Sequence, residues 1–356
     1  MVLEKRLSCP KWLRMVNPVI AVILGLLFSA VFIRASGVRP LEVYAAMFEG
    51  SFGSVYALSE TGVKMIPLLM IAVGCCISFR MGLWNAGAEG QIYIAGAVST
   101  WVIISLPAST PTAATLLLAF LAAFVSAGFY GLIAGILKLK WGVSELIVTL
   151  MLNYIGTLFI NYLLQGPLKD PDTYTPMVSK MFASNGQLPT LGNTRLHYGL
   201  FIALFLALGC WWIFQKTTWG FESKLIGSSQ QVALYSGISV NKYIIVGMFI
   251  SAGICGMVGA NEVCGITHRL STWFANDLGF SGMTVAYLAQ LNPLACILVA
   301  FLFGALMVGG SSMQRIGLPT TGVQMLQGAI LFFVVMGDVL TKYRVVLKGS
   351  RRASDV

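Results

Sequence analysis

The stretch RMGLWNAGAEGQIYIAG, residues 80–96, concentrates polar side chains between two apolar runs. It holds the amides of Asn85 and Gln91 and the carboxylate of Glu89, interspersed with glycines. An ionised side chain at the centre of a bilayer costs about 2.5–3.5 kcal/mol on insertion scales, so such groups face the bundle interior or a water-filled path. Three polar side chains among glycines therefore predict an irregular backbone that lines a cavity.

Other polar residues lie within apolar stretches further along the chain. Glu145 and Asn153 occur in GVSELIVTLMLNYI, and Glu262, Gln290 and Asn292 follow in the second half. Hydrogen bonding between helices, worth about 1 kcal/mol per contact in model systems, is the plainest role for such residues and the favoured one for Asn153 taken alone. The residues predicted to line a solute path are Asn85, Glu89, Gln91, Asn153 and Asn292.

Asn292 is included because two segments of the chain share a loose pattern. Residues 70–98 and 283–308 each run as an apolar segment, a polar break that contains Asn, and a stretch rich in small residues. Broken segments in corresponding halves of a transporter mark substrate sites near the membrane midplane. The match leaves an internal repeat open, with Asn85 and Asn292 in corresponding places.

No enzyme motif is present in the sequence. It contains no GxxxxGK[ST] phosphate loop, no nucleophile elbow and no HExxH zinc motif. The two histidines, His197 and His268, are far apart in sequence, and the seven cysteines show no metal-type spacing. We therefore expect no catalytic residue, no metal site and no bound cofactor. A single carboxylate at residue 89 also argues against a proton relay, which needs several acidic groups or histidines along one path.

Composition sets the fold class of this chain. Of 356 residues, 57% are hydrophobic and 10% are charged, against about 25% charged in soluble domains. Apolar runs of roughly 18 or more residues recur, and each can cross a bilayer as a helix. The sequence predicts a single all-α, polytopic membrane domain over residues 1–356 with about ten transmembrane helices, some of them short or broken. The expected helices are 16–34, 63–79, 88–106, 112–137, 143–164, 198–215, 243–263, 279–291, 293–310 and 322–341.

Charge predicts the orientation of the chain. The net charge of +10 is best explained by Lys and Arg in loops, since most of them fall on one side when the N-terminus is placed inside. Both termini are expected to be cytoplasmic, and no nucleic-acid partner is expected. Segment 279–291 is short for a full crossing, so a re-entrant half-helix is an alternative there.

Two polar stretches interrupt the expected spans. Residues 165–197 are rich in proline and turn residues and are predicted to be an outer loop. Residues 216–242 are predicted to be an inner loop, too long for a simple turn. Within it, Ser228–Ser236 has a serine cap candidate, apolar spacing and then Gly237, a pattern that predicts a short surface helix ended by glycine.

Several separated motifs, spread over residues 40–340, resemble one family of permeases. FRMGLWNAGAEGQIYIAG is similar to the FRxGLxNIGxEGQ stretch of permease subunits of ABC importers for simple sugars and nucleosides, which are related to ribose and branched-chain amino-acid permeases. SELIVTLMLNYIGTLFINYLLQGPLKDP, TRLHYG, EVCGITHRL and GFSGMTVAYLAQLNPLACILVAFLFGAL resemble the nucleoside branch, and specifically its larger permease subunit.

The resemblance implies a set of partners. They are a second, smaller permease, a cytoplasmic ABC ATPase that binds ATP and Mg²⁺, and an extracytoplasmic binding lipoprotein that delivers substrate. The chain itself would then be no enzyme, would bind no cofactor, and would lie among the lipids of a bacterial cytoplasmic (inner) membrane as a multi-pass subunit.

The resemblance also gives the inner loop a role, as the segment that docks into the ATPase. The family pattern G-x-N-P-x-A-A-x-Y-A-G-I corresponds here to GSSQQVALYSGI, in which Ser229 and Gln230 replace the Asn-Pro pair. Ser229 can still cap a helix, but the proline that would pre-set its first turn is missing. The residues that the resemblance assigns to coupling are Gly227, Gln231, Val232, Ala233, Tyr235 and Gly237.

Together these observations favour a transmembrane subunit of an ATP-driven importer of nucleosides. An ABC permease for ribose or another simple sugar is the alternative, because selectivity in such systems lies largely in the binding protein. An ion-coupled secondary transporter and a non-transporting scaffold remain as further alternatives. The residues alone favour the secondary transporter, and the resemblance reverses that order.

Overall fold

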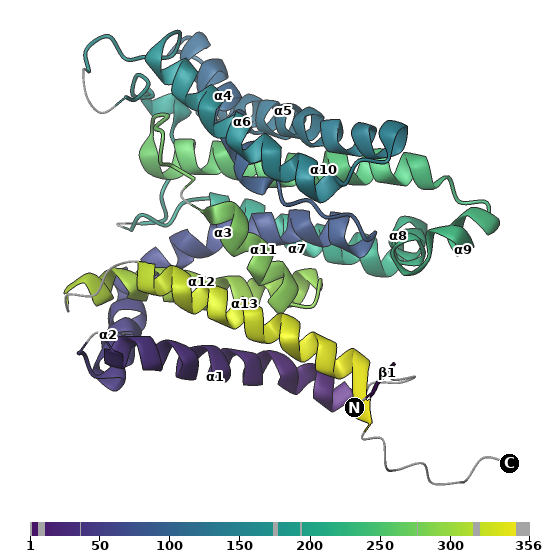
Figure 1. Cartoon of the computed structure of the whole chain (residues 1–356). Helices are drawn as coiled ribbons and strands as arrows, with labels where there is room; N and C mark the ends of the chain where they lie inside the picture. Colours follow the sequence, from purple (N-terminus) through teal and green to yellow (C-terminus); the bar gives the residue numbers. More distant parts are fainter. Residues whose placement is uncertain are drawn as a thin grey trace, which may run out of the picture. The chain divides into compact units, whose positions relative to one another are not determined.

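The computed structural model describes most of the chain, namely residues 2–5, 11–35, 37–173, 177–192, 194–275, 277–315 and 321–346. Helices dominate it, as predicted (Figure 1). In chain order, the elements are β1 (Val2–Lys5), α1 (Lys11–Ala35), α2 (Pro40–Phe52), α3 (Val55–Arg80), α4 (Ala88–Ser105), α5 (Thr112–Trp141), α6 (Glu145–Gln165), the 3₁₀ turn η1 (Ser184–Gly186), α7 (Gly199–Lys216), α8 (Thr218–Ser228), α9 (Gln230–Tyr235), α10 (Val240–Glu262), the π-helical turn η2 (Val263–Thr267), α11 (Leu278–Leu288), α12 (Pro293–Arg315), α13 (Thr321–Lys342) and β2 (Tyr343–Val346).

Every segment predicted to be a helix is one, although membrane crossing is a separate question. Six helices are long and apolar enough to cross a membrane, or seven if the bent pair α1 and α2 counts as one span, by length and composition among the described residues. Segment α11 is shorter, at 11 residues, which agrees with the expectation that it is short for a full crossing. Helices α2 and α8 were not predicted.

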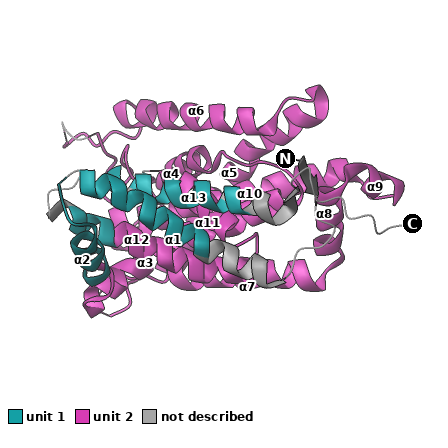
Figure 2. Ribbon diagram, turned by 60° about the horizontal axis from the view of Figure 1, so that its bottom comes forward, with its two compact units in different colours: residues 1–49, 309–356 teal, residues 50–308 magenta. Residues whose placement is uncertain are grey.

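The chain divides into two compact units (Figure 2). One comprises residues 1–49 and 309–356, and in it α1 pairs with α13 and β1 pairs antiparallel with β2. Gly25 permits the close approach of α1 and α13, because a Cβ atom there would lie 3.1 Å from the backbone of Ile330. Nearby, the rings of Phe28 and Phe333 meet at 6.1 Å.

The other unit, residues 50–308, is built around α3 and α10. Helix α10 packs against α3, α4 and α5, and the C-terminal half of α3 is buried almost throughout. Small residues make this possible in lipid, where helices associate through close van der Waals contact. A Cβ atom on Gly131 would lie 2.2 Å from that of Ala252, and one on Gly256 would lie 2.0 Å from that of Ala127. These contacts bring the backbones of α5 and α10 close together.

Helix ends in this unit follow local chemistry. The Ser54 hydroxyl accepts the Ala57 N–H at 3.0 Å and caps α3. Helix α5 ends at Gly142, whose φ of +67° lies in the left-handed region that glycine adopts without strain. Helix α6 begins three residues after Gly142, at Glu145, and so lies close to the end of α5. This short connection brings polar groups at the ends of α5 and α6 together.

Candidate functional site

The site lies at the break between α3 and α4, where the sequence predicted an irregular backbone. Residues 81–87 are not helical, and the turn begins at Gly82, whose φ is +73°. Met81, Leu83 and Asn85 in this break are fully buried. Because backbone groups in a buried break lack helical partners, they must be satisfied by side chains from elsewhere.

Asn85 and Gln91 form a reciprocal amide pair across the break. Asn85 Nδ2 donates to Gln91 Oε1 at 3.2 Å, and Gln91 Nε2 donates to Asn85 Oδ1 at 2.8 Å. Asn85 also donates to the Ser251 hydroxyl of α10 at 3.1 Å and accepts the Gly87 N–H at 3.2 Å. One side chain thus joins the break, the first turns of α4, and α10.

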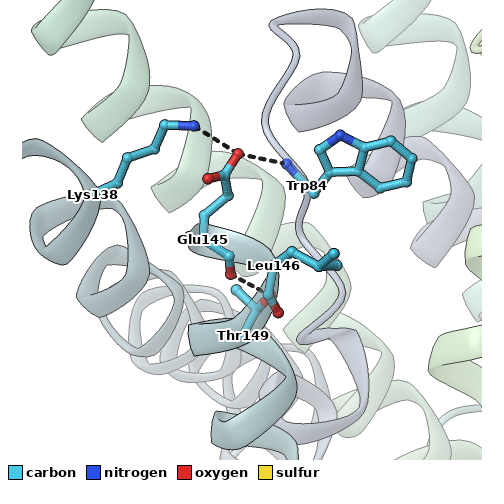
Figure 3. Close-up of polar contacts among 5 residues, drawn as sticks. All are labelled: Trp84, Lys138, Glu145, Leu146 and Thr149. Atoms are coloured by element: carbon cyan, nitrogen blue, oxygen red, sulfur yellow. Dashed lines mark hydrogen bonds and ion pairs between the residues drawn. The ribbon is translucent and has the colours of Figure 1, made fainter. Parts of the chain in front are cut away.

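Helix α6 supplies a ladder of polar side chains to the same break, beginning with Glu145 (Figure 3). Glu145 Oε1 accepts the Trp84 N–H at 3.3 Å and lies 2.7 Å from Lys138 Nζ at the end of α5. One turn along α6, Thr149 Oγ1 accepts the Ala86 N–H at 3.2 Å and donates to the Glu145 carbonyl at 2.7 Å. Two successive turns of α6 therefore each bind a backbone N–H of the break.

Asn153 continues this ladder another turn along α6. Its Nδ2 donates to the Ala86 carbonyl and its Oδ1 accepts the Gly90 N–H, both at 2.8 Å. The two helices cross in contact here, because a Cβ atom on Gly90 would lie 2.7 Å from the Leu152 carbonyl oxygen. Residues 145, 149 and 153 share one face of a helix by their spacing of four. The side chains on that face are hydrogen-bond partners for backbone groups of the break that have no helical partner.

Glu89 links α4 to the start of α11. Its two carboxylate oxygens accept the N–H groups of Asp277 at 3.0 Å and Gly279 at 2.9 Å. A carboxylate is favoured at the N-terminus of a helix by the unpaired N–H groups and the helix dipole. A Cβ atom on Gly279 would lie 2.6 Å from the Glu89 nitrogen, so glycine is needed for this approach.

Asn292 is the predicted path residue that the structure does not bring into this cluster. It is exposed and caps α12, where its Oδ1 accepts the Leu294 N–H at 3.1 Å. The pair Asn292-Pro293 matches the preference for a cap followed by proline at the first helical position. The preceding turn is tight, since Gln290 and Leu291 have φ values of 52° and 58°.

The arrangement has the properties of a scaffold. The amide groups of Asn85, Gln91 and Asn153 and both oxygens of Glu89 have partners within the protein. No group of three or more His, Cys, Asp or Glu side chains in the described part of the chain is placed to hold a metal ion. The network therefore fixes the shape of the break, and direct contact of these residues with a solute stays a prediction.

An aromatic cluster lies beside the network. The Trp84 side chain, 46% exposed, stacks on Tyr287 of α11 with 5.5 Å between ring centroids and 30° between the planes. Phe79 of α3 contacts both rings, at 5.6 and 5.1 Å. The Trp84 backbone N–H donates to Glu145, and this hydrogen bond fixes the point on the break from which the indole extends. These three rings connect the ends of α3 and α11 next to the break.

The short helix predicted in the inner loop is present as α9. Ser229 Oγ accepts the Val232 N–H at 3.4 Å, and Gly237, with a φ of +79°, follows the helix end. The capping and stop signals therefore act as the sequence predicted. Ala233, which the resemblance assigns to coupling, is fully buried and lies on the inner face of the helix, and its role in coupling stays a prediction.

The outward face of α9 is apolar and strongly exposed. Val232, Leu234 and Tyr235 have exposed fractions of 49%, 59% and 93%. Gln231 and Gly227 are also exposed, and Gly227, near the end of α8, packs so closely on one side that a Cβ atom would lie 2.1 Å from the Arg80 carbonyl oxygen. Figure 1 shows α8 and α9 together at one end of the helices of this unit. Leu234 was not in the predicted set, because its exposure depends on how α9 packs.

The loop between α6 and α7 is tied to the segment that follows α10. Ser179 N donates to the Leu270 carbonyl at 3.0 Å, and Phe182 N donates to the His268 carbonyl at 2.9 Å. His197 is fully buried at the end of this loop, and its Nδ1 accepts the Gly199 N–H at 3.2 Å. Burial, with a smaller effect of nearby His268, lowers the pKa of His197 to about 4. His197 is therefore neutral at physiological pH.

Comparison with known proteins decides the family of this chain. Residues 57–335 match the family described as the branched-chain amino acid transport system / permease component. The chain belongs to this permease family. It is a multi-pass membrane subunit of that class, and residues 57–335 include the complete break, α9 and the connecting helices.

Three relatives extend over nearly the whole chain. The guanosine ABC transporter permease protein NupP of Bacillus subtilis is 33% identical over 93% of this chain and 94% of its own length. The nucleoside ABC transporter permease protein NupB of Lactococcus lactis subsp. cremoris is 31% identical, with 91% of each chain covered. The glucose ABC transporter permease protein TsgB13 of Haloferax volcanii is 29% identical over 99% of this chain and 95% of its own.

Sequence reasoning missed several residues of the site. Thr149 was not singled out, although its place midway between Glu145 and Asn153 in a spacing of four was a usable signal. Ser251, which binds Asn85, gave no such signal because it belongs to a distant helix. Lys138 was not singled out either, because its pairing with Glu145 depends on the tight α5–α6 connection.

Proposed function

We propose that this chain is the larger membrane-spanning subunit of an ATP-driven importer that passes nucleosides through a bacterial cytoplasmic membrane. The observation that carries the proposal is the match to guanosine and nucleoside permeases at 33% and 31% identity over more than nine-tenths of the chain. The glucose permease relative supports simple sugars as a second candidate, at 29% identity. A nucleoside carries a sugar ring with hydroxyls, so the two candidates share part of their chemistry.

The break is the proposed element of the solute path. Asn85, Glu89, Gln91 and Asn153 hold residues 81–87 against α6, α10 and α11. In this role they set the shape of the path. They bind the hydroxyls or ring nitrogens of a nucleoside only when the network opens and their hydrogen bonds within the protein are exchanged for bonds to the solute. Asn292, exposed on the turn between α11 and α12, is the proposed path residue from the second half of the chain. Such a path binds weakly, because the solute must leave it.

The energy source is proposed to be ATP on partner subunits. The exposed apolar face of α9 is suited to a groove in a cytoplasmic ATPase. Its side chains are Val232, Leu234 and Tyr235. That ATPase would hold ATP and Mg²⁺, and this chain binds neither. Closure of the ATPases then pulls on α9, and the movement opens the break alternately to each side.

Two further partners complete the proposed complex. A second permease subunit encloses the path, and an extracytoplasmic binding lipoprotein delivers the nucleoside. The loop at residues 165–197 is the proposed docking site for that lipoprotein, because its backbone is held in place by the bonds of Ser179 and Phe182. Where the described part of the loop is held in this way, it loses less conformational entropy on binding.

Uptake in whole cells tests the energy source. Cells that contain the complete transporter are treated with an uncoupler while ATP is kept high by fermentation, and labelled guanosine uptake is measured. Persistent uptake supports the ATP-driven importer. Loss of uptake with ATP still high would instead favour an ion-coupled secondary transporter.

A further inference from the structure

We propose that Arg80 is a positioning residue that transmits movement of the α8–α9 arm to the break between α3 and α4. The inference rests on the proposed function, since it requires an ATPase that moves α9. It adds a named route between the docking helix and the solute path. Arg80 is the last residue of α3 and stands directly before the break.

The Arg80 side chain fastens α3 to the junction of α7 and α8. Its Nη2 donates to the Gly220 carbonyl of α8 at 3.2 Å, and its guanidinium lies 4.3 Å from the centroid of the Phe214 ring of α7. In the described part of the chain, no carboxylate lies within ion-pair distance of Arg80. A planar guanidinium can lie flat on a ring while it donates along its edge, whereas a lysine ammonium is a compact point charge that cannot stack in this way.

The Arg80 backbone provides a second attachment to the same arm. A Cβ atom on Gly227, near the end of α8, would lie 2.1 Å from the Arg80 carbonyl oxygen and 3.3 Å from the Met81 carbonyl carbon. Helix α8 therefore touches α3 near its start through Gly220 and near its end through Gly227. Held at two points along its length, α8 cannot tilt without displacing Arg80.

The arm itself is short and firmly connected. Ser229 is both the C-terminal cap of α8 and the N-terminal cap of α9, so a single residue joins the two helices. Ala233 is fully buried, and its carbonyl accepts the Ile238 N–H at 3.0 Å. A pull on the exposed face of α9 is therefore carried to α8 rather than absorbed by a flexible linker.

The residues that follow Arg80 in the break are also held by hydrogen bonds and close packing. The Leu83 N–H donates to the Ser78 carbonyl at 3.0 Å, and the Trp84 N–H donates to Glu145. The Met81 side chain occupies the space beside Gly247 of α10, where a Cβ atom would overlap it. Movement of Arg80 thus reaches Trp84 through the three intervening residues, Met81, Gly82 and Leu83.

The test uses the whole complex, with both permeases, the ATPase and the binding protein, in proteoliposomes loaded with ATP. Labelled guanosine uptake and phosphate release are measured together, and the readout is the ATP hydrolysed per guanosine transported. For Arg80→Ala we expect this ratio to rise about tenfold, a typical size for a lost coupling between sites. Co-purification of the ATPase should stay unchanged, because the exposed face of α9 is intact.

Two variants and one control keep the test decisive. Arg80→Lys keeps the charge but loses the stacked geometry, and Phe214→Leu removes the ring beneath it, so both should raise the ratio in the same direction. These two decide the matter if Arg80→Ala does not fold. Lys140→Ala is the matched control, since Lys140 is an exposed cation over the Trp141 ring at the end of α5, and its ratio should match the wild type.

The outcomes separate this inference from the proposed function. If the wild-type complex does not use ATP to take up guanosine, the proposed function fails before any variant is compared. If the wild type does so and the Arg80 variants keep the wild-type ratio, the inference is overturned while the function stands. A proportional fall of uptake and hydrolysis at an unchanged ratio also overturns it, because a purely structural role gives that result.

Discussion

Lys138 Nζ lies 2.7 Å from Glu145 Oε1, and the same oxygen accepts the backbone N–H of Trp84. The Glu145 side chain is 9% exposed, so this ion pair is shielded from water more than a surface pair is. It is the first of the polar contacts through which α6 holds the break. The stability of the break therefore depends on residues that lie outside it.

Removal of the Glu145 carboxylate should destabilise the protein. Glu145→Ala leaves the Trp84 N–H and Lys138 without their partner, and an unsatisfied buried group costs about 1–3 kcal/mol. We expect a lower thermal midpoint for the purified protein in detergent, measured by tryptophan fluorescence. Glu42→Ala is the control, because Glu42 forms an exposed pair with Arg39, and such pairs contribute about 0–1 kcal/mol. Equal midpoints for the two variants would contradict the account.

The crossing of α4 and α6 should not accept a side chain. Gly90→Ala places a Cβ atom 2.7 Å from the Leu152 carbonyl oxygen and 3.0 Å from Asn153 Cα, and both are backbone atoms that cannot rotate away. We expect strongly reduced folded protein in the membrane, measured by fluorescence-detected size-exclusion chromatography.

Gly209→Ala in α7 is the matched control for this change. No atom lies within 4 Å of a Cβ atom there, and alanine is favoured over glycine in a helix by about 1 kcal/mol. The yield of Gly209→Ala should equal or exceed that of the wild type. A normal yield for Gly90→Ala would show that the α4–α6 contact is looser than described.

The Glu89 carboxylate should be required for transport. Glu89→Gln retains the size of the side chain but presents an amide donor to one of the two backbone N–H groups at the start of α11. We expect guanosine uptake to fall about ten- to a hundredfold, the effect of losing a charge-assisted hydrogen bond of about 1.5–3 kcal/mol. Glu60→Gln serves as control, since Glu60 pairs with Arg195 away from the break. Wild-type uptake by a normally assembled Glu89→Gln complex would exclude a role for this carboxylate.

Binding of the ATPase should depend on the outer face of α9. Tyr235→Ala removes a side chain that is 93% exposed, and a central aromatic contact of this kind contributes about 2 kcal/mol or more, equivalent to about thirtyfold in affinity. We expect loss of ATPase co-purification with unchanged thermal stability of the permease.

Ala233→Glu should act differently from Tyr235→Ala. It buries a charge under α9 and should lower the stability of the permease itself. Lys224→Glu, on the exposed surface of α8, is the control and should leave both properties close to wild type. ATPase binding that survives Tyr235→Ala would place the docking surface elsewhere.

The buried His197 should make stability depend on acid. Its pKa falls from 6.5 to about 4 on folding, so the unfolded chain binds the proton more tightly than the folded one. The contribution of His197 to the free energy of unfolding is therefore fully present above pH 6.5. It is lost as the pH falls toward 4, by about 2 kcal/mol between pH 7 and pH 5. Thermal midpoints at these two pH values measure the effect. His197→Gln should flatten this dependence, and an unchanged dependence would assign it to other groups.

Local patterns predicted the parts of the fold that depend on local chemistry. The break followed from polar residues and glycines at 80–96, and α9 followed from a serine cap and Gly237. Contacts between distant segments could not be read in this way. The burial of Ala233 depends on the packing of α9 against its neighbours, and Asn292 was placed with Asn85 because a cap before proline resembles a polar break.

Uptake of labelled guanosine by cells with and without this gene tests the central claim most directly, with unlabelled ribose and glucose as competitors at equal concentration. The account predicts that guanosine uptake disappears without the gene and that neither sugar competes when the gene is present. Unchanged guanosine uptake together with loss of ribose or glucose uptake would contradict the nucleoside assignment and make the chain a sugar permease.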